Sequence, residues 1–165
     1  MVWWFALSSI VVLWDAGYAL LRPWSMENGS LHALWTPYKL YGEIDYLYGW
    51  PAFLAHDGFC SAQSAMNLVE TALNVYFLLL HSRGDTRRAM LVGYTSQIMT
   101  SSKTLLYWLN EYFSGFAHIG HNGWAQLVAL WMVPNGLWLV IPTIIAVHFG
   151  RALDVVGSKP VRKRA

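Results

Sequence analysis

Four apolar runs, each about as long as a membrane-spanning helix, are the feature that most constrains this chain. They cover residues 2–21, 61–80, 89–109 and 124–149. A helix needs roughly 20 apolar residues to cross the hydrocarbon core of a bilayer. Charged residues make up only 12% of the chain, about half of what soluble domains carry. The pattern predicts an all-α, integral membrane four-helix bundle, and a soluble helical bundle is the alternative.

The segments outside these runs differ in charge, and the difference predicts an orientation. Arginine dominates segment 81–88, and lysine and arginine dominate the C-terminal tail at 153–165. Segments 22–60 and 110–123 carry mainly acidic residues. With four spans, the two basic segments fall on one side of the membrane, which the positive-inside rule makes cytoplasmic. We therefore expect a multi-pass protein with both termini in the cytoplasm.

Other signals bear on the membrane in which the protein resides. The basic residues near the C-terminus resemble an endoplasmic-reticulum retrieval signal, which favours that membrane. The run at 2–21 has no basic region before it, and Asp15 interrupts it, so we interpret it as a retained span rather than a signal peptide. Asn28 begins an Asn-Gly-Ser glycosylation triplet on the predicted lumenal side.

Segment 22–60 is too long for a simple turn between two spans. It is rich in tryptophan, tyrosine and glycine, as in "LHALWTPYKLYGEIDYLYGWP". Aromatic side chains with a polar tip favour the membrane interface. We expect a structured first loop that packs as a cap over the lumenal end of the bundle. The domain organisation is then one transmembrane domain at 1–152, followed by a basic cytoplasmic tail.

Each predicted span contains polar residues at helical spacing, which place them on one face of the helix. In the second span these residues are Ser64, Asn67, Glu70, Thr71 and Asn74. In the third they are Gln97, Thr100, Lys103, Thr104 and Tyr107. The first span offers Asp15 with Tyr18, and the fourth offers Asn135 with Trp138. An ionisable residue at membrane depth costs about 3 kcal/mol and usually faces the bundle interior.

Asp15, Glu70 and Lys103 lie in three different spans, which leaves a structural and a catalytic interpretation open. In the structural one, Lys103 neutralises one carboxylate within an internal hydrogen-bonded network. The other carboxylic acid is then left without a basic partner, and burial keeps it protonated. The catalytic interpretation starts from this protonated acid. A neutral carboxyl group beside aromatic rings can protonate an alkene, and the rings then stabilise the carbocation. A second carboxylate removes a proton, which gives double-bond migration or ring closure.

Several other motifs predict no further chemistry. His118 and His121 form a His-x-x-His pair in a glycine-containing loop with no third ligand, so we expect no metal site. Cys60 is the only cysteine. The chain has no phosphate-binding loop or dinucleotide fingerprint, and we expect no cofactor. The net charge of +2 comes from a short basic tail beside a membrane, which favours membrane lipids over nucleic acid as a partner.

Three stretches, "MNLVETALN", "LLYWLNEYFSGFAH" and "PNGLWLVIP", resemble the emopamil-binding protein family, also called the EXPERA domain. The resemblance runs from about residue 5 to 152. This family includes a sterol isomerase, a sigma-type receptor and small fungal enzymes of natural-product pathways. The resemblance implies a bundle of membrane helices around a site for lipophilic molecules.

Matched position by position, Glu70 is similar to the family's acidic residue on this helix, and Asn135 and Trp138 to the Asn and Trp of its last helix. Asp15 falls where the isomerase has a glutamate, and Asp45 with Tyr48 resembles an Asp-x-x-Tyr of the first loop. The polar faces of the predicted spans and the family resemblance together predict catalytic roles for Asp15 and Glu70. They predict a substrate pocket formed by Tyr18, Asn67, Asn74, Lys103, Thr104, Tyr107, Asn135 and Trp138.

The chain also departs from the sterol isomerase. Val11 stands where the isomerase has a histidine, and Lys103 and Thr104 stand where it has Gly and Asp. We therefore favour a specialised isomerase or cyclase that acts on a terpenoid, sterol or polyketide-type intermediate in a biosynthetic pathway. The alternatives are a non-catalytic sterol-binding or lipophilic-ligand-binding protein of the receptor branch, and a structural subunit of a membrane complex. A homodimer is compatible with each of these functions.

Overall fold

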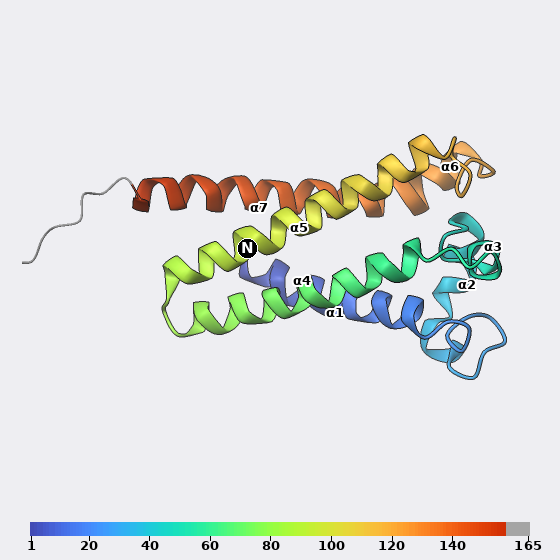
Figure 1. Ribbon diagram of the computed structural model, residues 1–165, viewed down its shortest axis with the longest axis horizontal. Coiled ribbons are helices and arrows are strands. Elements are labelled where there is room, and N and C mark those ends of the chain that lie inside the picture. Colours follow the sequence, from blue (N-terminus) through green and yellow to red (C-terminus); the bar gives the residue numbers. More distant parts are fainter. Residues whose placement is uncertain (158–165) are drawn as a thin grey trace, which may run out of the picture.

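The computed structural model describes residues 1–157, and these residues form helices and loops with no strand (Figure 1). Residues 158–165, most of the predicted basic tail, lie outside the described part. The long helices are α1 (Val2–Leu20), α4 (Phe59–Ser82), α5 (Thr86–Phe113) and α7 (Val133–Gly157). Helix α7 continues directly from the short helix α6 (Trp124–Gln126) and the π-helix η2 (Leu127–Met132). The predicted all-α fold is therefore confirmed.

The four long helices pack in the order of the chain. Helix α1 packs on α4, α4 packs on α5, and α5 packs on α7 (Figure 1). Helices α1 and α7 meet through aromatic side chains, since the Trp4 and Trp138 rings lie 5.2 Å apart and the Phe5 and Phe149 rings 6.1 Å apart, centroid to centroid. The α4–α5 turn lies at the end of the bundle where α7 finishes. The opposite end carries the segment between α1 and α4.

The turn between α4 and α5 is short because local signals stop one helix and start the next. Gly84 has a φ of +75°, a left-handed conformation that glycine adopts without a steric penalty and that ends α4. Asp85 is the N-cap of α5, and its carboxylate accepts a hydrogen bond from the Arg88 backbone N–H at 3.3 Å. Two antiparallel helices follow from this sequence.

Helices α4 and α5 bury polar side chains and expose apolar ones. The buried polar residues are Ser64, Glu70, Thr71 and Asn74 on α4, and Ser96, Gln97, Thr100, Thr104 and Glu111 on α5. The exposed apolar residues include Met66, Val69, Val75 and Leu79 on α4, and Leu91, Ile98, Leu105 and Leu106 on α5. This distribution is the reverse of that on a helix of a soluble protein. The inward direction predicted for both polar stripes is confirmed.

Two stretches of helix are long and apolar enough to cross a membrane. They are Val2–Leu20 and the continuous helix Trp124–Asp154. Helices α4 and α5 are also long, but their inward polar side chains lower the mean hydropathy. Both exceed the apolar runs predicted at 61–80 and 89–109: α4 gains residues 59–60 and 81–82, and α5 gains residues 86–88 and 110–113.

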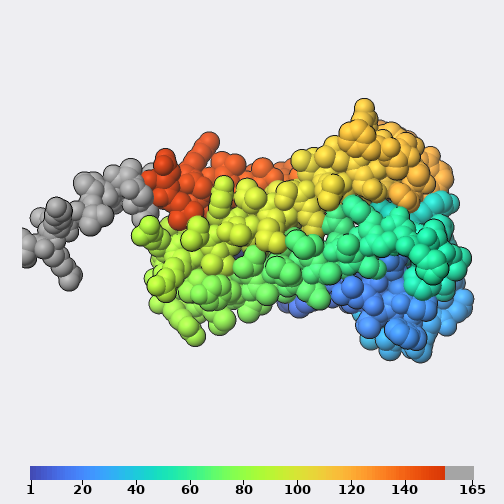
Figure 2. All heavy atoms as spheres, in the orientation of Figure 1, coloured from blue at the N-terminus to red at the C-terminus, as the bar shows by residue number. Residues whose placement is uncertain are grey.

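The segment between α1 and α4 is structured, as expected. It contains the 3₁₀ helix η1 (His32–Trp35), α2 (Pro37–Ile44) and α3 (Trp50–Leu54). Both α-helices have a proline in their first turn, a position that needs no backbone N–H donor. Figure 2 shows this segment packed over one end of the bundle, beside the loop that joins α5 to α6. We call the segment of residues 21–58 the cap.

The cap is fastened to the bundle through a buried arginine. The Arg22 guanidinium donates to the backbone oxygen of Leu47 at 2.9 Å and to the Ser61 hydroxyl at 3.2 Å. It thereby joins the end of α1 to the cap and to the first turn of α4. Buried Met26, Trp35 and Tyr38 pack against the same end of α1 and form a small apolar core with Tyr18.

Candidate active site

A cavity of about 480 Å³ lies where the cap meets the bundle. Its walls come from α1, α2, α4, α5 and the start of α7, and apolar atoms form most of them. Sites for small molecules usually have volumes of roughly 300–1,000 Å³ and mostly apolar walls with a few polar groups. The predicted site residues that line the cavity are Asp15, Asn67, Lys103, Thr104, Tyr107, Asn135 and Trp138. The cavity is therefore suited to a lipophilic ligand.

Asp15 is the carboxylic acid in the wall of this cavity. The Tyr38 hydroxyl donates to its Oδ1 at 2.6 Å, and the Tyr48 hydroxyl donates to its Oδ2 at 3.1 Å. No lysine, arginine or histidine in the described part of the chain forms an ion pair with Asp15. The carboxyl group is thus held in place by two phenols, without a basic partner.

The two phenols come from the cap. The polar residues at helical spacing in the predicted spans therefore could not predict them. Burial raises the pKa of Tyr38 and of Tyr48. Both hydroxyl groups therefore keep their protons at neutral pH and can donate to Asp15. The dense aromatic pattern of the first loop was the only signal for Tyr38, and the Asp-x-x-Tyr resemblance had singled out Tyr48.

Tyr18 does not line the cavity, although it was predicted in the substrate pocket. Its ring stacks on Tyr38 with centroids 4.1 Å apart, and its hydroxyl donates to the Tyr48 backbone oxygen at 2.9 Å. Tyr18 lies one helical turn after Asp15, on the side of α1 that faces the cap. It therefore positions the two tyrosines that hold Asp15.

Glu70 also lies outside the cavity, which departs from the expectation that it shares a site with Asp15. Its Oε1 lies 3.2 Å from Lys103 Nζ, and its Oε2 accepts a hydrogen bond from the Thr100 hydroxyl at 2.8 Å. The space beside it is about 10 Å³, room for no more than one water molecule. The polar stripe of α4 faces α5, and this rotation of the helix directs Glu70 away from Asp15.

Lys103 connects the Glu70 region to the cavity. Its ammonium group contacts the Asn67 side-chain oxygen as well as Glu70. Lys103 and Asn67 both line the cavity, and 15% of the Lys103 side-chain surface is exposed. The cavity therefore contains an amine and a carboxylic acid on different walls.

Asn74, another predicted pocket residue, takes part in helix packing instead. Its side-chain oxygen accepts a hydrogen bond from the Ser96 hydroxyl at 2.6 Å, which joins α4 to α5. Asn74 borders the small space beside Glu70 rather than the cavity. Hydrogen bonds between polar side chains of neighbouring helices are common in membrane proteins.

Asn135 and Trp138 follow the π-helix at the start of α7. Pro134 has no backbone N–H and leaves a carbonyl in the preceding turn without its helical partner. The Asn135 side chain donates to the Trp131 backbone oxygen at 2.9 Å and lies 3.5 Å from the Tyr41 hydroxyl. Asn135 therefore stabilises this irregular turn and contacts the cap.

Trp138 brings an aromatic face to the cavity from α7. Its ring lies 5.2 Å from the Trp4 ring, centroid to centroid, and the Trp4 N–H donates to Gln97 at 3.0 Å. These contacts fix the indole between α1 and α7. An ordered aromatic ring of this kind can stabilise a positive charge on a bound molecule.

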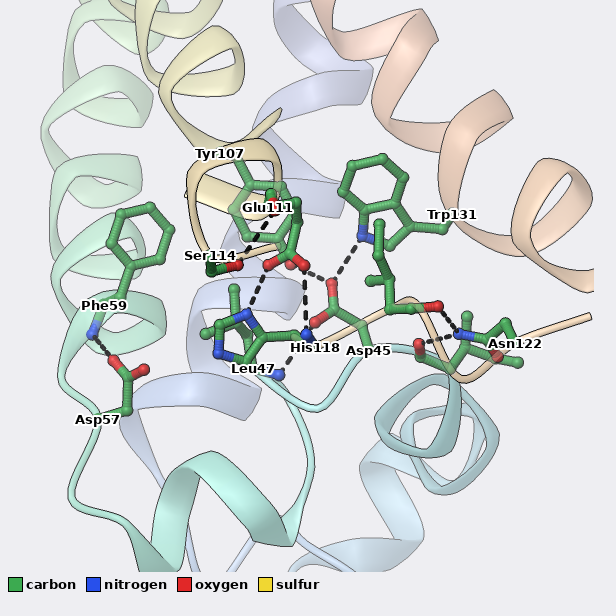
Figure 3. Close-up of polar contacts among 12 residues, drawn as sticks. Asp45, Leu47, Asp57, Phe59, Tyr107, Glu111, Ser114, His118, Asn122 and Trp131 are labelled. Carbon is green, nitrogen blue, oxygen red and sulfur yellow. Dashed lines mark hydrogen bonds and ion pairs between the residues drawn. The ribbon is translucent and has the colours of Figure 1, made fainter. Parts of the chain in front are cut away.

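A second aspartate, Asp45, is buried beside the cavity but does not line it (Figure 3). Its Oδ2 accepts hydrogen bonds from the Trp131 N–H at 2.8 Å and from the Tyr107 hydroxyl, and its Oδ1 accepts one from the Leu47 N–H at 2.9 Å. Burial raises the pKa of Asp45 to about 6, although these hydrogen bonds act in the opposite direction. Asp45 thus ties the cap to α5 and to the π-helix.

His118 of the 114–123 loop lies at the same end of the bundle, beside Glu111 and Asp45 (Figure 3). The His118 ring lies 2.7 Å from the buried Glu111 carboxylate, and the His118 backbone N–H also donates to Glu111. His121 stacks on Tyr46 and lies 2.7 Å from the Glu43 backbone oxygen. Both rings are engaged in packing this loop against the cap and α5.

The chain matches no protein-family model and no curated protein sequence. The resemblance to the emopamil-binding protein family therefore stays a prediction that depends on the three short motifs.

Proposed function

We propose that this protein is a membrane-embedded isomerase or cyclase that acts on an alkene of the terpenoid, sterol or polyketide type. One observation carries the proposal: Asp15, held by two tyrosine hydroxyls, lies in the wall of an apolar, aromatic cavity. The resemblance to a family that includes a sterol isomerase supports the same reaction class.

In this proposal all four long helices span a membrane, the endoplasmic reticulum being the expected one. Apolar side chains are exposed along each of them, including α4 and α5, whose polar residues face inward. Lipid solvates such a surface and water does not. The arginine-rich turn at 83–88 lies at the end where α7 finishes, and the positive-inside rule supports a cytoplasmic location for this end.

The ligand reaches the cavity from the bilayer. Val11 and Trp14 of α1 and Leu40 of α2 line the cavity and are 39%, 40% and 51% exposed. A hydrocarbon ligand can therefore pass beside α1 without crossing water.

The chemistry follows from Asp15 in its neutral form. Its O–H transfers a proton to one alkene carbon, and the positive charge that develops on the neighbouring carbon faces aromatic rings such as Trp138. Tyr38 and Tyr48 donate to the carboxylate that results, which stabilises it. Loss of a proton to Asp15 then forms a new double bond, or an internal hydroxyl or alkene captures the cation in a ring closure. The proton balance closes without a redox cofactor.

The test is conversion of sterol and terpenoid alkenes by the purified protein in D₂O. We expect an isomerised or cyclised product that carries deuterium at the protonated carbon, and none from Asp15→Asn. Asp154→Asn is the matched control, because Asp154 is exposed at the end of α7, away from the cavity. Product from Asp15→Asn at the wild-type rate would contradict the assignment.

A non-catalytic receptor for lipophilic ligands is the second candidate. The position of Glu70 favours it, because Glu70 pairs with Lys103 outside the cavity and leaves the cavity with one carboxyl group rather than two. A receptor would bind sterols or terpenoids and return them unchanged. Saturable binding with no deuterium in the recovered ligand would establish this function in place of catalysis.

A further inference from the structure

We propose that the cavity also takes lipophilic aldehydes or ketones, which form a Schiff base with Lys103. This inference depends on the proposed role of the cavity as a site for lipophilic ligands, but not on alkene protonation by Asp15. The two observations that carry it are the position of Lys103 in the cavity wall and the Glu70 carboxylate beside its Nζ.

Lys103 differs in its surroundings from Lys39, the other lysine in the described part of the chain. Lys39 pairs with Glu27 at 2.6 Å on the surface of the cap, and 52% of its side-chain surface is exposed. Lys103 pairs with Glu70 at 3.2 Å, and only 15% of its side chain is exposed, toward an apolar cavity. Residues 1–157 therefore contain one solvated and one enclosed lysine–glutamate pair.

The enclosed pair can generate the neutral amine that attack on a carbonyl requires. An ion pair removed from water is costly, because neither charge keeps its hydration. Transfer of one proton from Lys103 Nζ to Glu70 gives an amine and a carboxylic acid with no change in net charge. Desolvation in an apolar pocket is a recognised way to activate a lysine nucleophile. The Asn67 side-chain oxygen accepts a hydrogen bond from Nζ and orients it.

The covalent step is a condensation whose atoms balance. The Nζ lone pair attacks the carbonyl carbon, a C–N bond forms, and the carbonyl oxygen takes the proton held by Glu70. One proton from the nitrogen and the hydroxyl group then leave as water when the C–O bond breaks, which gives a protonated imine beside the Glu70 carboxylate. Return of the remaining N–H proton to Glu70 gives the neutral imine, so that aldehyde and amine yield imine and one water molecule. No oxidant or reductant takes part. The apolar walls limit the access of water, which slows hydrolysis of the imine.

The test uses the intact chain in detergent micelles with farnesal, an isoprenoid aldehyde, followed by borohydride. Borohydride reduces an imine to a stable secondary amine, which mass spectrometry of peptides assigns to one lysine. We expect the adduct on Lys103 to form at least roughly tenfold faster than on Lys39. Farnesol, the matching alcohol, should give none. Labelling of Lys39 as fast as Lys103 would overturn the inference.

Two glutamate variants sharpen the result. Glu70→Gln removes the proton acceptor and should slow labelling of Lys103 roughly tenfold or more, whereas Glu27→Gln should leave it unchanged. Unchanged labelling in a folded Glu70→Gln protein would contradict the role of the pair. The two proposals can fail separately. If Lys103 forms the adduct but no deuterium enters a converted alkene, only alkene protonation by Asp15 is contradicted. If deuterium enters the alkene but Lys103 forms no adduct, only the Schiff base is contradicted.

Discussion

Asp15 and Asp45 both face inward and both accept hydrogen bonds from aromatic side chains. They differ in their surroundings, because only Asp15 borders a cavity. Two tyrosines donate to Asp15, and a tyrosine, a tryptophan and a backbone N–H donate to Asp45. Asp45 is fully buried among packed side chains, while Asp15 borders a cavity of about 480 Å³. Similar hydrogen-bond donors therefore surround both acids, but only Asp15 can meet a ligand.

The difference shows that hydrogen bonding alone does not separate a structural acid from a reactive one. Asp45 holds three elements together and has no space in front of it. Two tyrosine hydroxyls hold Asp15, and the cavity lies beside it. We therefore expect substitution of Asp45 to lower stability and substitution of Asp15 to lower turnover.

The largest effect should come from Asp15→Asn. The amide cannot give a proton to an alkene, so turnover should fall at least a thousandfold, about 4 kcal/mol in activation free energy. The rate of product formation from a converted alkene measures this loss. The unfolding temperature should stay near that of the wild type. A folded Asp15→Asn protein that retains a tenth of the activity would break the comparison.

Asp45→Ala should have the largest effect on stability. It leaves the Tyr107, Trp131 and Leu47 donors without their acceptor in a buried place, at a cost of about 3 kcal/mol. Chemical unfolding in detergent micelles measures the change. Asp15→Ala is the matched control and should cost less, because the two donors that it leaves without an acceptor, Tyr38 and Tyr48, line the cavity. Equal losses of stability in the two variants would mean that the acids do not differ as described.

The raised pKa of Asp45 predicts a dependence of stability on pH. The folded protein binds the Asp45 proton more tightly than the unfolded chain, since the pKa rises from 3.8 to about 6 on burial. Stability should therefore fall as pH rises from about 4 to 6, by no more than about 3 kcal/mol, and stay level above that range. Asp45→Asn should remove this part of the dependence. If the wild type instead gained stability relative to Asp45→Asn as pH rises from about 4 to 6, the buried environment described for Asp45 would be contradicted.

The smallest effect should come from Tyr38→Phe. It removes one donor to Asp15 and keeps the ring that stacks on Tyr18. Turnover should fall roughly tenfold, about 1.4 kcal/mol, because the carboxylate formed after proton transfer loses one charge-assisted hydrogen bond. Tyr76→Phe is the control, since Tyr76 is exposed on α4 and does not line the cavity. An unchanged rate in Tyr38→Phe would show that this donor does not act in the reaction.

The sequence was sufficient to predict the helices and their inward faces. Polar residues such as Glu70 and Thr100 recur every three or four positions, and that spacing determines which side chains share a face whatever the helix packs against. It also placed Asp15, Lys103 and Asn135 near one another, because each lies on the polar face of its own span.

The contacts of each site residue could not be predicted from periodicity. The direction in which α4 turns its polar face depends on how closely α5 packs, and this sends Glu70 to Lys103 rather than to Asp15. Tyr38 reaches Asp15 only because the cap folds back over α1, a long-range contact that no local pattern encodes. The π-helix before Asn135 likewise depends on tertiary packing around Trp131.

Labelling with dicyclohexylcarbodiimide tests the contrast between the two aspartates most directly. This lipophilic reagent enters the bilayer and reacts with neutral carboxyl groups that it can reach. We predict that Asp15 is modified first in the folded protein, that a bound sterol or terpenoid protects it, and that Asp45 is not modified. Modification of Asp45 or Glu70 ahead of Asp15, or no modification of Asp15, would contradict the account.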